Sequence, residues 1–151
     1  MSNRTIAPAV ALLALAAGGF GASRAEAGFV QLPRSSTGMR WYCPVASHHW
    51  GTPRLVNKLL LLGRSWRRST GGTVRVGDMS LPRGGRFRPH ATHRDGKAAD
   101  LGTMGSTARN QRFVNLMHGT GGVSFILFNG RGIRGVRRAA GHNDHMHLQI
   151  R

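Results

Sequence analysis

The chain has 151 residues, a length typical of one domain. It carries 22 Lys and Arg against 5 Asp and Glu, a formal net charge of +17, so we expect an anionic partner. A hydrophobic content of 40% with 22 glycines and three tryptophans argues against a disordered chain. The single cysteine, Cys43, excludes an intramolecular disulfide and a four-cysteine zinc site. Histidines and carboxylates would therefore have to hold any metal.

Residues 1–27 resemble a secretory signal peptide. A basic residue, Arg4, precedes the apolar run 6–20, and small residues lead to a predicted cleavage after Ala27. A membrane anchor is the alternative, but this run is shorter than the roughly 20 residues that a span needs. We therefore predict no stable membrane span and a single domain over residues 28–151.

Export changes what the positive charge means. Without residues 1–27 the chain keeps 20 basic and 4 acidic residues. In the periplasm or outside the cell, the abundant anionic polymer is peptidoglycan with its attached wall polymers, and this is the partner we expect. The arginines are scattered and are not interleaved with aromatic residues, so no nucleic acid partner is expected. The sequence leaves the oligomeric state open.

Two helices and three strands are predicted along residues 28–151. Thr52 and Pro53 are typical of a helix start, and leucines at helical spacing follow up to about Trp66. The remaining predicted elements are a strand over 73–76, a loop over 77–89, a helix over 106–118 and strands over 123–128 and 145–150. These elements predict the α+β class: a small single domain with a short antiparallel sheet, two helices and long polar loops.

Two short segments hold most of the residues that can carry chemistry. The four acidic residues outside 1–27 and five of the eight histidines all lie within residues 77–102 and 141–150. In the predicted last strand His145 and His147 point to the same face, because side chains alternate along a strand. Gly96 lets the backbone turn between His93 and Asp100, so that both could reach one ion.

Two histidines and one carboxylate form the ligand set of a catalytic zinc site. His93, Asp100 and His147 would leave one coordination position open for water, and zinc would bring the pKa of that water toward neutrality. His145 is placed to act beside it as a base or electrostatic partner. The same donor set also occurs in non-haem iron oxygenases, which usually separate the first histidine and the carboxylate by a single residue, not by six.

Simpler structural roles are expected for several other polar residues. Asp78 is expected to organise its loop, and Asp144 to orient a histidine. Cys43 is expected to be a small buried hydrophobic residue, because the sequence identifies no basic partner for a reactive thiol. His48 and His49 lie outside the motifs and are expected to be loop residues.

The motifs resemble those of penicillin-insensitive murein endopeptidases, members of the LAS group of metallopeptidases. His-x-x-His-x-x-Gly-x-x-x-Asp ends at Asp100, and His-x-x-His-x-His ends at His147. Further similar segments are Trp50-Gly51-Thr52-Pro53, Gly77-Asp78-Met79-Ser80, Pro82-Arg83-Gly84-Gly85 and Ile126-Leu127-Phe128-Asn129. The resemblance covers about residues 50–151 and implies a LAS/hedgehog-like metallopeptidase core whose sheet carries the metal site.

The resemblance also implies roles for individual residues. Zn²⁺ would be held by His93, Asp100 and His147, with His145 as the catalytic histidine beside the activated water. His142 would assist near the transition state, and His90 would line the site. The implied reaction is hydrolysis of the D-alanine to meso-diaminopimelate cross-link in peptidoglycan.

Two alternatives remain open from the sequence. The D,D-carboxypeptidase branch of the same group typically ends in Glu-x-x-His-x-His, whereas His142 stands in place of that glutamate and favours the endopeptidase branch. Only 41 residues separate Asp100 from His142, fewer than in the family, so another wall-peptide specificity remains an alternative. A non-catalytic basic module that binds the cell wall or nucleic acid is the other, although a purely structural zinc site would have a fourth protein ligand.

Overall fold

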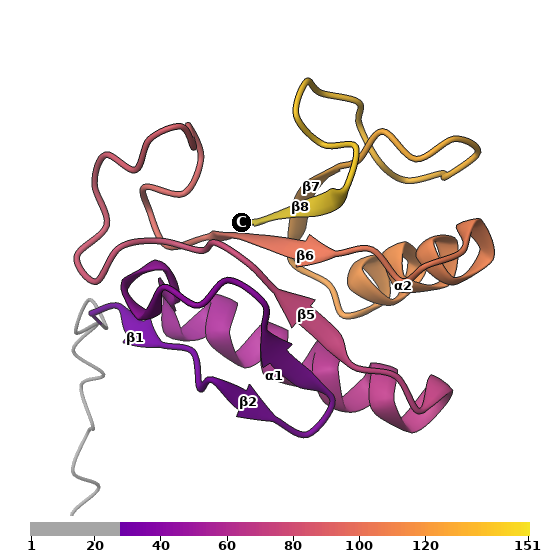
Figure 1. Cartoon of the computed structure of the whole chain (residues 1–151), viewed down its shortest axis with the longest axis horizontal. Helices are drawn as coiled ribbons and strands as arrows, with labels where there is room; N and C mark the ends of the chain where they lie inside the picture. The colour runs from indigo at the N-terminus through magenta and orange to yellow at the C-terminus, as the bar shows by residue number, and fades with distance from the viewer. Residues whose placement is uncertain (1–27) are drawn as a thin grey trace, which may run out of the picture.

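A computed structural model describes residues 28–151 of the chain (Figure 1), so the predicted signal peptide lies outside the described residues. The elements are, in chain order, β1 (Val30–Gln31), β2 (Ser35–Ser36), β3 (Met39–Trp41), the 3-10 helix η1 (Ala46–His48), β4 (Trp50–Gly51), α1 (Pro53–Thr70), β5 (Val74–Val76), β6 (Ala98–Gly102), α2 (Thr107–Gly119), β7 (Val123–Leu127) and β8 (His145–Ile150). Within this part of the chain, no helix has the length and hydropathy to cross a bilayer.

Both predicted helices form, and their ends have clear local causes. The Thr52 hydroxyl accepts a hydrogen bond from the backbone N–H of Leu55 at 3.3 Å, and Pro53 occupies the first turn of α1. The helix continues one turn beyond the predicted end at Trp66 and stops where Gly71 adopts φ 69°. The Ser106 hydroxyl caps α2 in the same way through the N–H of Arg109.

The main sheet has six strands in the order β2-β3-β5-β6-β8-β7, and β1 pairs with β4 separately. All pairings are antiparallel except β3 with β5, which run parallel because α1 forms the crossover between them. The α+β class and the two helices agree with the sequence prediction. The sheet is larger than predicted and mixed, since the sequence analysis did not identify β1 to β4 or β6.

The central pair, β6 and β8, divides the sheet into an apolar and a polar face. Leu101 lies opposite Met146, and Ala99 lies opposite Leu148; all four are fully buried in the hydrophobic core. The alternate residues point to the other face, where the register places Asp100 opposite His147. Both helices contact the sheet or its neighbouring strands and supply the rest of the core, including Leu59, Trp66 and Phe113.

Two long loops complete the polar side. Residues 77–97 connect β5 to β6, and residues 128–144 connect β7 to β8. Figure 1 shows both loops rising from the sheet on the side away from α1. Gly96, with φ 68°, turns the first loop back into β6, and its carbonyl accepts a hydrogen bond from the N–H of Thr52 at 2.9 Å. A Cβ at this position would lie 2.9 Å from the Thr52 nitrogen, so the close approach requires glycine.

Candidate metal centre and comparison with known proteins

Three donor atoms converge on the polar face of the β6–β8 pair. Asp100 Oδ1 lies 2.9 Å from His147 Nδ1 and 3.3 Å from His93 Nε2, and the two imidazole nitrogens are 3.1 Å apart. All three side chains are almost completely buried. Asp100 and His147 come from neighbouring strands, while His93 reaches them from the loop before β6.

Outer partners orient both imidazoles. His93 Nδ1–H donates to the carbonyl of Met79. This leaves the lone pair of Nε2 directed at the other two donor atoms, with which it forms the donor triangle His93, Asp100 and His147. His147 Nε2 lies 3.1 Å from the Thr92 hydroxyl; when it donates its proton there, Nδ1 is free to act as a ligand. Two imidazole lone pairs and one carboxylate oxygen can then face one point, and these residues could therefore hold a cation.

The ionisation of the buried pair favours this use. Burial by itself would raise the pKa of the Asp100 carboxyl, but its close contacts with the imidazoles of His147 and His93 outweigh that effect and hold the pKa well below its usual range. Burial also lowers the pKa of the His147 imidazole, although Asp100 partly opposes this. An ionised carboxylate and a neutral imidazole are the forms that bind metals.

Two further histidines flank the triangle. His145 Nε2 lies 3.8 Å from Asp100 Oδ1, and its Nδ1–H donates to Asp144 Oδ1 at 2.9 Å. That hydrogen bond holds the pKa of the exposed Asp144 carboxyl below its ordinary value. His142 Nδ1–H donates to the carbonyl of Ala140 at 2.8 Å, and its ring lies 5.0 Å from the ring of His145. In both residues one ring nitrogen is fixed by a partner and the other remains available.

His90 connects the triangle to a second carboxylate. Its Nδ1 lies 3.7 Å from Asp100 Oδ2, and its Nε2 lies 3.1 Å from Asp78 Oδ2. Each of three side chains offers one ligand atom within 4.8 Å of the other two: His90, His93 and Asp100. Asp78 thus does more than organise its own loop, since it orients a histidine that faces the centre.

These residues open into a cleft of about 430 Å³ between the two long loops. The polar groups on its wall are His90, Thr92, His93, Asp100, His142 and His145. His147 lies behind Asp100 and is 2% exposed. A substrate in this cleft would meet Asp100 and His93 at its floor and His142 and His145 at its side.

The fold brings together all six residues that the sequence analysis singled out for the site. The sequence reasoning missed Thr92 and the Met79 carbonyl, which orient His147 and His93. Thr92 lies inside the first motif, so its position was a usable signal. A backbone carbonyl carries no sequence signal, and only the fold could reveal the contact with Met79.

Two other expectations were wrong. Cys43 is half-buried, and its Sγ lies 4.0 Å from His48 Nδ1, so a basic partner does exist. The sequence did not indicate it because η1 folds His48 back toward the end of β3. His48 ends the 3-10 helix η1 instead of lying in a loop. His49 does lie in the loop before β4, but it is fully buried and its ring stacks on Trp41 at 3.8 Å.

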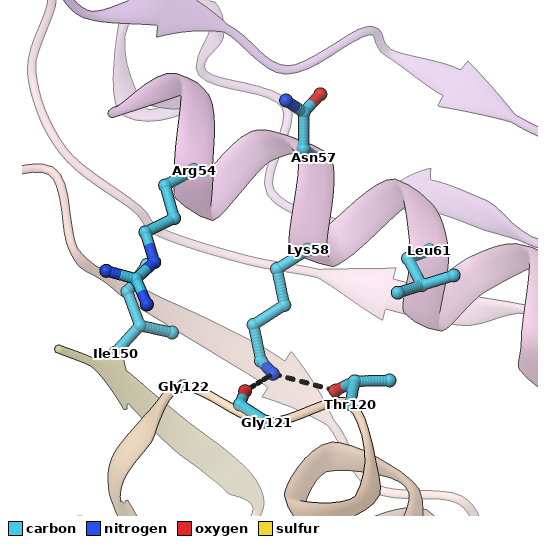
Figure 2. Close-up of a pocket in the computed structure, with 8 residues that line it drawn as sticks. All are labelled: Arg54, Asn57, Lys58, Leu61, Thr120, Gly121, Gly122 and Ile150. Atoms are coloured by element: carbon cyan, nitrogen blue, oxygen red, sulfur yellow. Dashed lines mark hydrogen bonds between the residues drawn. The ribbon is translucent and has the colours of Figure 1, made fainter.

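A second cavity, of about 280 Å³, lies between α1 and the turn after α2 (Figure 2). Lys58 Nζ donates there to Thr120 Oγ1 at 2.7 Å, to the Gly121 carbonyl at 2.5 Å and to the Met117 carbonyl at 3.2 Å. Burial and the nearby Arg54 lower the pKa of Lys58. The three donated bonds use all the hydrogens of the ammonium group, so Lys58 joins α1 to the end of α2 and has none left for a ligand.

Comparison with known proteins identifies the family. The model of the penicillin-insensitive murein endopeptidase family matches residues 17–118. A penicillin-insensitive murein endopeptidase of Yersinia enterocolitica is 36% identical over 87 residues, which cover 57% of this chain and 31% of that protein. The corresponding Klebsiella pneumoniae protein is 37% identical over 71 residues, 46% of this chain and 26% of its own length.

The chain thus spans less than a third of the length of these curated relatives. The family match includes His90, His93 and Asp100, whereas His142, His145 and His147 lie beyond its last residue. The sheet register nevertheless places His147 opposite Asp100. On the strength of the match over residues 17–118, this chain belongs to the penicillin-insensitive murein endopeptidase family.

Proposed function

We propose that this protein is an exported zinc peptidase that hydrolyses the D-alanine to meso-diaminopimelate cross-links of peptidoglycan. The observation that carries the proposal is the convergence of His93, Asp100 and His147 beside an open cleft that is lined by His93, Asp100 and two more histidines, His142 and His145. Membership of the family and the name of both relatives support the choice of substrate.

The spacing of the three donor atoms suits zinc. Ligand atoms about 2.0–2.1 Å from a tetrahedral zinc ion are about 3.4 Å from one another. The separations here are 2.9, 3.1 and 3.3 Å, so a small adjustment would accommodate the ion. Three protein ligands would leave a fourth coordination position for water or substrate, which is typical of a catalytic site. When bound, zinc supplies Lewis acidity that polarises a peptide carbonyl and makes a water molecule more acidic.

The protein's own side chains would manage the proton and the developing charge. With Nδ1–H held by Asp144, His145 Nε2 can accept a proton from the attacking water or, once protonated, donate a hydrogen bond to the oxyanion. His142, held by the Ala140 carbonyl, presents its other nitrogen on the same side of the cleft. Neither role needs a serine or cysteine nucleophile.

Export is part of the same proposal. Cleavage after Ala27 would release residues 28–151 into the periplasm or outside the cell, where peptidoglycan is accessible. Amino-terminal sequencing of the protein recovered from its native compartment tests this step. A new terminus at or near Gly28 is expected, and an intact terminus in the cytoplasm would contradict it.

The direct test is digestion of purified, cross-linked peptidoglycan, with the muropeptides read by mass. We expect cross-linked dimers to become monomers, with the activity lost in a chelator and restored by Zn²⁺. Release of only a terminal D-alanine would assign a D,D-carboxypeptidase instead. Wall binding without any cleavage, with metal present, would assign a non-catalytic wall-binding module.

His145→Ala separates metal binding from chemistry. We expect the variant to retain zinc, because His145 is outside the donor triangle, and to hydrolyse about 10²- to 10⁴-fold more slowly. His118→Ala is the matched control, since its imidazole bonds the Gly135 carbonyl and does not line the cleft. Wild-type activity in His145→Ala would remove this residue from the mechanism.

A further inference from the structure

A second cluster of metal-ligating side chains lies beside the cleft but outside the donor triangle. Cys43, His48 and Asp78 each offer one ligand atom, and these atoms lie within 4.8 Å of one another. Cys43 follows β3, His48 ends η1 and Asp78 follows β5, so three separate segments bring them together. All three are half-buried, which leaves the cluster open to ions from solution.

The three ligand atoms of this cluster face one another. His48 Nδ1 lies 2.9 Å from Asp78 Oδ1 and 4.0 Å from Cys43 Sγ, so one ring nitrogen faces both groups. The Nδ1–H of His48 and the thiol of Cys43 can both hydrogen-bond to the Asp78 carboxylate, so all three side chains meet at one point. A cation at the centre would engage the sulfur, the nitrogen and the oxygen together.

The cluster does not form a nucleophilic triad. A cysteine nucleophile needs a histidine whose two nitrogens serve different groups, one the thiol and the other an orienting acid. Here the same nitrogen faces both Cys43 and Asp78. The arrangement fits a ligand set and not a thiol activated for attack.

We propose that Cys43, His48 and Asp78 form a second metal site, selective for thiophilic divalent ions such as Zn²⁺, next to the candidate catalytic centre. A thiolate and a carboxylate would neutralise the charge of the ion, and the imidazole is a suitable third ligand. The proposal does not depend on the reaction that the cleft catalyses.

The two sites are separate but share a partner. Asp78 faces His48 with Oδ1 and His90 with Oδ2, at 2.9 and 3.1 Å. Phe87 packs between the two histidines, with ring centroids 4.6 Å from His48 and 4.9 Å from His90. An ion on Oδ1 would fix the Asp78 carboxylate and thereby the orientation of His90, which makes Asp78 a positioning residue for the cleft.

Cobalt substitution tests the site without reference to activity. The reduced protein is titrated with Co²⁺ alone, and the near-ultraviolet charge-transfer band of a thiolate bound to cobalt is recorded. Because Cys43 is the only cysteine in the chain, this band reports the second site and no other. We expect the band in wild type, two metal ions per chain by elemental analysis, and one ion with no band in Cys43→Ser.

Variants of the other ligands show whether the sulfur binds within the predicted cluster. His48→Gln and Asp78→Asn are expected to weaken the Co²⁺ affinity, measured from the growth of this band, at least about tenfold. Even the outer partners of metal ligands contribute about 10- to 100-fold to metal affinity. The matched controls, His118→Gln and Asp95→Asn, should keep wild-type affinity. His93→Ala should also keep the band, because it alters only the other site.

Several results would overturn the proposal. The first is the absence of the band in folded wild type. The second is an unchanged band in both His48→Gln and Asp78→Asn, or loss of the band in His93→Ala. The third is dimerisation on adding Co²⁺, which would mean that two chains share the ion through Cys43. Wild type alone provides a check if the variants fail to fold. Zn²⁺ should slow the reaction of Cys43 with a disulfide reagent, and an unchanged rate would contradict the site.

Discussion

The histidine-lined cleft and the Lys58 cavity use polar side chains in opposite ways. In the cavity shown in Figure 2, Lys58 donates to three oxygens of the fold and has no hydrogen left for a ligand. In the cleft, His142 and His145 each give one nitrogen to a protein partner and keep the other available. The comparison shows that burial and charge alone do not mark a site; unused hydrogen-bonding or coordinating capacity does.

The largest effect is expected from removing the charge of Asp100, the carboxylate that both His93 and His147 contact. Asp100→Asn keeps the shape of the side chain but removes the negative charge that two imidazoles contact. We expect zinc binding to be lost and cross-link hydrolysis to fall at least about 10³-fold, as measured by metal analysis and muropeptide mass. Near-normal hydrolysis in this variant would mean that the triangle is not the reactive centre.

A smaller effect is expected from the outer partner of His147. Thr92→Val is similar in volume but removes the hydroxyl 3.1 Å from His147 Nε2. Loss of this orienting contact should weaken zinc affinity about 10-fold, measured by competition with a chromophoric chelator, while the folded structure is retained. Thr107→Val, at the start of α2, is the matched control. Thr120→Val is unsuitable because Thr120 accepts a hydrogen bond from Lys58. Equal affinities would assign Thr92 to local structure only.

Removing the Lys58 ammonium group should lower the stability of the protein but not its activity. Lys58→Met preserves the apolar stem but removes the three donated hydrogen bonds that tie α1 to the end of α2. We expect the free energy of unfolding in urea to drop by about 1–3 kcal/mol, because three hydrogen bonds from a charged group are lost. Hydrolysis by the folded fraction should match wild type, and a selective loss of activity would contradict the purely structural role.

Salt should produce the smallest change. Residues 28–151 hold 20 basic and 4 acidic residues, so we expect them to attract an anionic wall polymer. Added salt shortens the screening length from about 10 Å at 0.1 M to about 3 Å at 1 M. We expect the rate on intact peptidoglycan to fall several-fold over this range, while hydrolysis of a small neutral cross-linked peptide stays nearly constant. Equal salt dependence for both substrates would argue against steering by charge.

The sequence predicted the helices well because their signals are local. Thr52 with Pro53, and Ser106, mark the two helix starts, and the apolar residues that follow have helical spacing. The strand β8 was also predictable, since polar and apolar residues alternate from His145 to Leu148. β6 was missed because Ala98–Gly102 is short, is buried along its whole length and shows no alternation.

The six candidate site residues could be identified from two motifs and from the resemblance of these motifs to those of the family. Their arrangement could not, because it depends on partners far apart in the chain. The β6–β8 register sets Asp100 against His147, and the loop after β5 brings the Met79 carbonyl to His93. Such contacts leave no local sequence pattern.

The sequence by itself determined the α+β class, the helix starts and the candidate site residues, since each depends on composition or on spacing along a few turns. Only the tertiary structure decided which donor atoms share a centre, that Lys58 is committed to the fold, and that Cys43 lies beside His48 and Asp78. These outcomes depend on strand register and loop packing. Both are set by burial of the whole apolar core, not by the residues at the site.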